Sequence, residues 1–154
     1  TPTMGYIHLG DGLVLLCGIL LGPGLGAAAA GIGSMFADIF SGYAAWAPAT
    51  LIIKAATAFL GGWVFHKLHV SGFATPVRTV LAGIPAEIVM VFGYYVYEVG
   101  LAMAGGSAFG AAAVATASGV PFNIVQGAAG VIVSAVLLPI LSRASGDLRA
   151  RIHA

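Results

Sequence analysis

Residues 120–141 read VPFNIVQGAAGVIVSAVLLPIL, a stretch that contains no Asp, Glu, Lys, Arg or His. A helix needs about 20 mostly apolar residues to cross the hydrocarbon core of a bilayer, so this stretch predicts a membrane-spanning helix. The strands of an outer-membrane barrel alternate apolar and polar residues instead. The stretch therefore favours an all-α fold, a polytopic membrane helix bundle.

The composition of the whole chain supports this interpretation. Of its 154 residues, 60% are hydrophobic and only 7% are charged, whereas soluble domains carry about 25% charged residues. Six Lys and Arg residues and five Asp and Glu residues are too few to cover a soluble protein of this size. A soluble enzyme and a disordered chain are excluded. The net charge of +1 excludes a nucleic-acid binder.

Gly/Pro clusters and the few charges divide the chain into five apolar segments within a single integral membrane domain, residues 1–154. We expect spans over residues 12–21, 25–40, 48–65, 77–99 and 120–141, an external loop over 1–10 and a cytoplasmic tail over 142–154. The first two segments are short for a span. The Ala- and Gly-rich residues 104–119 predict an external loop with a short helix.

The distribution of the cations predicts the orientation, because Lys and Arg are enriched in cytoplasmic loops. Lys67 and Arg78 flank the connection between the third and fourth segments, and Arg143, Arg149 and Arg151 lie in the tail. Both basic stretches fall on the same side of the membrane if all five segments cross it. We therefore expect a cytoplasmic C-terminus.

Polar side chains gather in the half of the bundle that this orientation places outside. An ionisable group at mid-bilayer costs roughly 2.5–3.5 kcal/mol on insertion scales, so such groups point to function. The inner half is nearly all apolar, which predicts a blind pocket open to the outside and not a channel or a proton pump. The candidate ligand-binding residues are His8, Trp46, Lys54, Glu87, Tyr94, Asn123 and Gln126, with Asp11, Asp38 and Glu98 as a second tier.

These side chains suit a small, flat ligand, since aromatic rings stack on its faces while amides and charges bind its edge. Alternatives without a ligand stay open. Lys54 and Glu87 can neutralise each other inside the bundle, and Asn123 and Gln126 can form interhelical hydrogen bonds. Asp11 can cap the first helix.

Two acids near the expected helix ends have alternatives as well. Asp38 can bond the exposed amides of the turn at Ser41 and Gly42, and Glu98 can lie at the water interface. No nucleophile–base pair, phosphate-binding loop or metal-ligand cluster appears in the sequence. We therefore expect no catalytic residues, no cofactor and no metal, and the chain is not predicted to be an enzyme.

Several motifs resemble the substrate-binding S components of energy-coupling factor (ECF) transporters. In the first half they are GYIHLGDG at 5–12, LGP at 21–23, GIGS at 31–34 and APATLIIK at 47–54. In the second half they are GYYVYE at 93–98 and NIVQG at 123–127, together with Glu87. The resemblance is closest to the subgroup that includes hydroxymethylpyrimidine and pyridoxine transporters.

The resemblance implies a six-helix S component in a prokaryotic cell membrane that binds a vitamin or precursor from outside. Its implied partners are a transmembrane coupling (T) subunit and two cytoplasmic ATPase subunits, and no nucleic acid. The family has a helix before the GYIHLGDG motif, and Thr1 begins where the following loop should be. We therefore expect five of the six helices, with the first one missing. Docking to the coupling subunit then falls to the small residues Ala27, Ala30 and Ser34.

The function that the resemblance implies is high-affinity binding and uptake of a small water-soluble vitamin of the pyridoxine (B6) or hydroxymethylpyrimidine type. Within transport, riboflavin or thiamine is the alternative cargo. The alternative outside transport is a structural or assembly subunit of a membrane complex with no ligand of its own, because tight helix packing alone explains many small residues.

Overall fold

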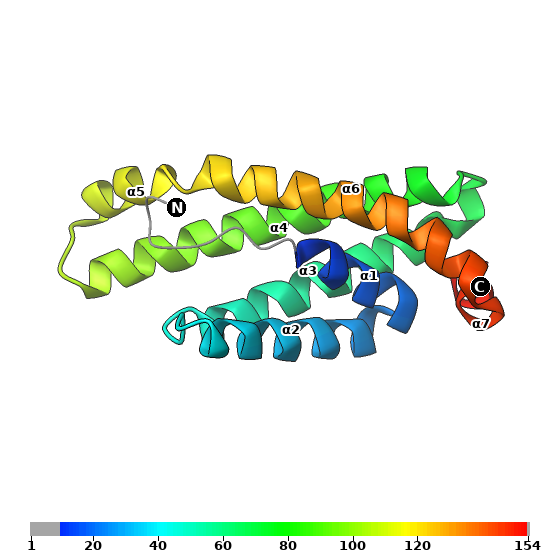
Figure 1. The fold of residues 1–154 in the computed structure, drawn as a ribbon. Helices are drawn as coiled ribbons and strands as arrows, with labels where there is room; N and C mark the ends of the chain where they lie inside the picture. Colours follow the sequence, from blue (N-terminus) through cyan, green and yellow to red (C-terminus); the bar gives the residue numbers. More distant parts are fainter. Residues whose placement is uncertain (1–9, 154) are drawn as a thin grey trace.

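The computed structural model describes residues 10–153, which form helices joined by short connections (Figure 1). The elements are α1 (Asp11–Leu21), α2 (Pro23–Phe40), α3 (Ala47–Lys67), the 3-10 helix η1 (Leu68–Ser71), α4 (Thr75–Ala104), α5 (Phe109–Ala117), α6 (Val120–Ala144) and α7 (Gly146–His153). No strand occurs between residues 10 and 153. The predicted all-α fold is therefore confirmed.

Four helices, α2, α3, α4 and α6, are long and apolar enough to cross a membrane. Helix α1 has 11 residues and rises only about 16 Å at 1.5 Å per residue, whereas the hydrocarbon core is about 30 Å thick. The span expected over residues 12–21 thus corresponds to a helix that is short for the hydrocarbon core, and it stays a prediction. Among the described residues there are four candidate spans, and α1 is a half-length helix packed among them.

Proline and glycine set several of the helix boundaries. A proline stands in the first turn of α2, α3, α4 and α6, where its missing N–H would have no intrahelical partner in any case. Gly22 has a φ of +83°, which a residue with a Cβ adopts only with strain. This residue turns the chain sharply, so that α2 begins directly after α1.

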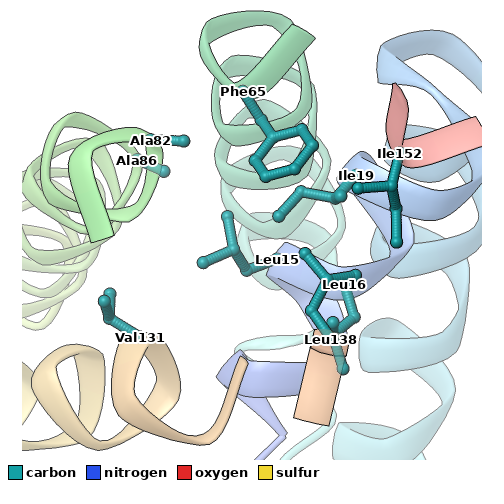
Figure 2. Close-up of a cluster of buried hydrophobic side chains, with 9 residues drawn as sticks. All are labelled: Leu15, Leu16, Ile19, Phe65, Ala82, Ala86, Val131, Leu138 and Ile152. Atoms are coloured by element: carbon teal, nitrogen blue, oxygen red, sulfur yellow. The ribbon is translucent and has the colours of Figure 1, made fainter. Parts of the chain in front are cut away.

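Helix α1 lies at the centre of the bundle (Figure 1). Figure 2 shows its Leu15, Leu16 and Ile19 between side chains from four other helices. The surrounding members of this hydrophobic cluster are Phe65 of α3, Ala82 and Ala86 of α4, Val131 and Leu138 of α6, and Ile152 of α7. The short helix therefore supplies the core around which the long helices pack.

Glycines let the helix backbones approach within the bundle. A Cβ added at Gly18 of α1 would lie 2.0 Å from the carbonyl oxygen of Ala58 in α3, and one at Gly62 would lie 2.2 Å from the oxygen of Gly18. On α2, a Cβ at Gly26 would lie 2.4 Å from the oxygen of Cys17. These three glycines thus act in packing within the chain, because in lipid close backbone contact replaces the missing hydrophobic driving force.

The connections lie at two opposite ends of the bundle. Figure 1 shows α7 and the α3–α4 connection at one end, and the α2–α3 and α4–α5 connections at the other. In the region where we expected a loop with a short helix, α5 forms, and the Tyr95 hydroxyl donates a hydrogen bond of 3.2 Å to the oxygen of Ala113. The tail forms a further helix, α7, which we had not expected from the sequence.

Candidate functional site

A buried polar network joins α1, α3 and α6 in the middle of the bundle. The Asp11 carboxylate at the start of α1 forms an ion pair with the Lys54 ammonium of α3. Its other oxygen accepts a hydrogen bond of 2.6 Å from Nε2 of Gln126 in α6. Lys54 is only 2% exposed and Asp11 is fully buried. The N-terminus of a helix favours a negative charge, so the position of Asp11 at the start of α1 adds to the stabilisation of its carboxylate.

Tyr94 of α4 extends this network toward the end of the bundle that holds the α2–α3 connection. The Lys54 ammonium lies 5.3 Å from the centroid of the Tyr94 ring, a cation–π distance. The Tyr94 hydroxyl and the Thr50 hydroxyl are 3.0 Å apart and share a hydrogen bond. Both side chains are buried, so the face of the Tyr94 ring and its hydroxyl are held in fixed positions.

Glu87 of α4 lies beside this network without being bonded into it. The residue is 7% exposed, and neither carboxyl oxygen has a hydrogen-bond partner among the described residues. The carboxyl packs against α6, since a Cβ at Gly127 would lie 2.9 Å from Oε2. Glu87 interacts electrostatically with both Asp11 and Lys54. An unpaired buried carboxyl is costly, so this group stands ready for a hydrogen-bond donor.

Trp46 covers the same face of α4 from the α2–α3 connection. It packs beside the buried cluster of Ala49, Ile53, Met90 and Tyr94. The Trp46 side chain hydrogen-bonds Glu98, and the Tyr97 hydroxyl donates to the carbonyl oxygen of Ala45.

Trp46 also meets Tyr43 edge-on, with ring centroids 6.0 Å apart. Together, the contacts of Trp46 with Glu98 and of Tyr97 with Ala45 hold the α2–α3 connection against α4.

The structure brings together Lys54, Glu87, Tyr94 and Gln126 from the predicted ligand-binding set, and Asp11 from the second tier. Asn123 is half-buried one turn before Gln126. Asp38 is buried near the end of α2, where its backbone oxygen accepts a hydrogen bond of 2.8 Å from the Tyr43 amide. His8 lies outside the described residues.

Two of the ligand-free alternatives are wrong. Lys54 forms its ion pair with Asp11 and not with Glu87. Asp11 does not cap α1, because Gly10 is the N-cap residue and α1 has no side-chain cap. The interhelical alternative for Gln126 is confirmed, since this amide bonds α6 to α1. Glu98 is half-buried and bonded by Trp46, so it is only partly open to water.

The expected docking residues on α2 require one correction. Ala30 is buried and packs with Val14 of α1 and Ala58 of α3, so it is not available to a partner. Ala27 and Ser34 are half-buried and keep part of their surface. The reason is that α2 uses one small-residue face for α1 and α3, and a sequence run of small residues does not show which face that is.

A groove of about 630 Å³ runs between α4 and α6 beside Glu87. Apart from Glu87 and Tyr95 its lining is apolar, and several of its side chains are exposed on the outer surface of the bundle: Ile84, Ile88, Phe92, Ile124 and Ile132. The groove therefore opens sideways, toward the lipid in a membrane. Among the described residues no group of three metal-ligating side chains occurs.

The sequence reasoning missed Thr50 and underrated Asp11. Thr50 precedes Lys54 by one helical turn, a spacing that places both side chains on one face of α3. Asp11 has the sequence context of a helix cap, because it stands in a Gly-Asp-Gly stretch before an apolar run. In the structure it is the acceptor for both Lys54 and Gln126.

The comparisons with known proteins point to one family. A family model described as "ECF-type riboflavin transporter, S component" matches residues 1–143 of the chain. A protein of Pyrococcus woesei, described as "Uncharacterized protein in gap 3'region", is 39% identical over 92 residues. That match covers 60% of this chain, and the chain spans 58% of the length of that relative. No solved structure matches the chain.

Proposed function

The chain belongs to the family of ECF-type riboflavin transporter S components, and we propose that it binds a small water-soluble vitamin or vitamin precursor for ATP-driven uptake. The family is one of transport subunits and not of enzymes. The observation that carries the proposal is Glu87, a buried carboxyl with two unpartnered oxygens beside a bonded Asp11–Lys54–Gln126 network. A ligand with N–H or O–H donors on a ring edge would satisfy it.

The cargo that we propose is a ring of the pyridoxine or hydroxymethylpyrimidine type. Glu87 would accept from the ring edge, Tyr94 and Trp46 would contact its face, and Asn123 and Gln126 would orient it. In this proposal Lys54 acts mainly by holding Asp11 and the ring of Tyr94 in place. His8, which precedes α1 in the sequence, is the remaining proposed ligand contact. Riboflavin and thiamine are the next cargoes to test.

The orientation that we propose places the end with Lys67, Arg143, Arg149 and Arg151 in the cytoplasm, following the enrichment of cations in cytoplasmic loops. The end with Trp46 and Glu98 then faces outside and admits the cargo. The four candidate spans agree with this arrangement, because an even number of crossings returns the C-terminus to the side on which α2 begins.

The partners that we propose are a transmembrane coupling subunit and two cytoplasmic ATPase subunits. The sequence holds no phosphate-binding loop, so the energy for transport would come from those subunits. The part of α2 around Ala27 and Ser34 is the proposed contact with the coupling subunit, without Ala30.

Thermal unfolding of the purified protein in detergent, with pyridoxine, hydroxymethylpyrimidine, riboflavin or thiamine, tests the proposal. A cargo at 100 times its Kd should stabilise the protein by about 2.7 kcal/mol. Glu87→Gln should weaken that cargo about 2- to 12-fold, because it replaces one carboxyl oxygen by an amide group that cannot accept, and a hydrogen bond contributes about 0.5–1.5 kcal/mol. Asp147→Asn, an exposed acid in α7, is the control and should leave the affinity unchanged.

Two results would contradict the proposal. Absence of a shift with every vitamin would favour the ligand-free assembly subunit. An unchanged affinity in Glu87→Gln, in a protein that unfolds at the wild-type temperature without ligand, would remove Glu87 from the site.

A further inference from the structure

The C-terminal helix α7 is anchored firmly to the end of the bundle. Ile152 is 1% exposed and packs into the core cluster with Leu16, Ile19 and Leu138 (Figure 2). Its carbonyl oxygen accepts a hydrogen bond of 3.3 Å from Nη1 of Arg78 in α4. The Ile152 side chain and the hydrogen bond from Arg78 therefore hold α7 against the bundle.

Arg78 takes part in this anchor through both of its terminal nitrogens. It is only 3% exposed, Nη2 donates a hydrogen bond of 3.0 Å to the oxygen of Phe65, and the guanidinium lies 4.1 Å from the centroid of the Phe65 ring. Of the cations near this end, Arg78 thus holds the helix ends together and is not available for an external anion.

The other four cations of this end are exposed and have few acids near them. They are Lys67 at the end of α3, Arg143 at the end of α6, and Arg149 and Arg151 of α7. The acid at this end is Asp147, whose 3.2 Å pair with Arg151 is exposed on both sides and contributes little. The remaining four acids of the chain are Asp11, Asp38, Glu87 and Glu98, which lie inside the bundle or toward its opposite end.

Trp63 indicates the depth of these cations in a membrane. Its ring is 46% exposed on the outer surface of α3, and the Lys67 ammonium lies 5.2 Å from the ring centroid. Trp side chains gather at the level of the lipid headgroups. Figure 1 shows α7 at the same end of the bundle as the α3–α4 connection that follows Lys67. A Trp63 ring at headgroup level would place Lys67, and with it this end of the bundle, close to the lipid phosphate groups.

We propose that this end of the protein, formed by Lys67, Arg143, Arg149 and Arg151, binds the phosphate headgroups of anionic phospholipids. The anchor of Ile152 and Arg78 holds α7 across the bundle end, so the guanidinium groups of Arg149 and Arg151 need no folding step before they bind. Each cation near an anionic membrane surface strengthens binding about fivefold. This surface is independent of the proposed vitamin site.

The test compares thermal unfolding in a neutral detergent with added short-chain phosphatidylglycerol or with phosphatidylcholine of the same chain length. We expect phosphatidylglycerol to raise the Tm by several degrees more than phosphatidylcholine, and the difference to shrink at high salt, where charges are screened. Arg149→Gln/Arg151→Gln should weaken the phosphatidylglycerol response at least tenfold in lipid concentration. Arg149→Lys/Arg151→Lys, which keeps both charges, should retain it.

Equal responses to the two lipids, or a full phosphatidylglycerol response in the double Gln variant, would overturn the proposal. A matching response to glycerol 3-phosphate would also overturn it, in favour of a site for a free phosphate. If the double Gln variant does not fold, Lys67→Gln/Arg143→Gln replaces it with the same expected loss. Loss of binding to coupling and ATPase subunits, with the lipid response intact in the Gln variants, would assign the surface to a protein partner instead.

Discussion

At the scale of residues, the ion pair of Asp11 and Lys54 sets the electrostatics of the bundle interior. Both groups are buried, and Gln126 satisfies the second carboxylate oxygen. Taking two charges out of water is expensive, and the pair offsets that cost only while both partners are present. The intact pair therefore adds little net stability compared with the cost of breaking it.

Lys54→Met should destabilise the protein strongly, because it leaves the Asp11 carboxylate buried without its cation. Breaking a buried pair in this way costs about 3–5 kcal/mol, measured by denaturant unfolding in detergent. The double variant Asp11→Asn/Lys54→Met removes both charges, so its free energy of unfolding should fall much less. If the single and double variants lost the same free energy of unfolding, the unpaired Asp11 charge would not be the cause of the destabilisation.

At the scale of elements, most helices follow from the sequence. The apolar runs and their prolines predict α2, α3, α4 and α6, because lipid forces every backbone N–H and C=O into intrahelical bonds. Helix α7 could not be predicted from the sequence, because eight residues with three charges form a stable helix only when Ile152 packs into a hydrophobic core. The half-length α1 likewise depends on its neighbours.

The α1–α3 crossing gives a packing prediction. Gly18→Ala would place a methyl group 2.0 Å from the oxygen of Ala58, so backbone must move. We expect the free energy of unfolding to fall by about 1–3 kcal/mol or more, as for overpacked cores, measured by thermal unfolding in detergent. The matched control is Gly33→Ala on α2, where an added Cβ meets no atom within 4 Å; this variant should be neutral or slightly stabilising, since Ala is the better helix former.

The α7 anchor gives a second prediction for an element. Ile152→Ala removes most of the side chain that enters the core, and such truncations cost about 2–5 kcal/mol. A short helix is not stable without this packing, so the amides of α7 should lose hydrogen-exchange protection while those of α3 and α4 keep theirs. Leu148→Ala, at a half-buried position of α7, is the control and should lose less protection. Unchanged exchange in Ile152→Ala would contradict the anchoring role.

At the scale of the whole molecule, the two ends of the bundle differ in charge and in structure. One end carries the exposed cations and α7, and the other carries the connection with Trp46 and the contacts of Glu98 and Tyr97. This asymmetry is the basis of the proposed orientation, with cargo entering at the end without cations.

Single cysteines test this orientation in intact cells. In a Cys17→Ala background, Ser107→Cys in the α4–α5 connection should react with a membrane-impermeant maleimide added outside. Ser71→Cys at the end of η1 should react only after the membrane is permeabilised. The opposite pattern would invert the proposed topology and place the Trp46 end in the cytoplasm.

The sequence by itself determined that the protein is an all-α membrane bundle, because a chain with so few charges and such long apolar runs is stable only as helices in lipid. It also identified Lys54, Glu87, Tyr94 and Gln126, since polar groups are rare and therefore conspicuous in apolar helices. Only the tertiary structure decided which of them pair. Asp11 accepts from Lys54 and Gln126 while Glu87 stays unbonded, and this choice depends on close contacts between helices distant in the chain, which glycines such as Gly18 and Gly127 permit.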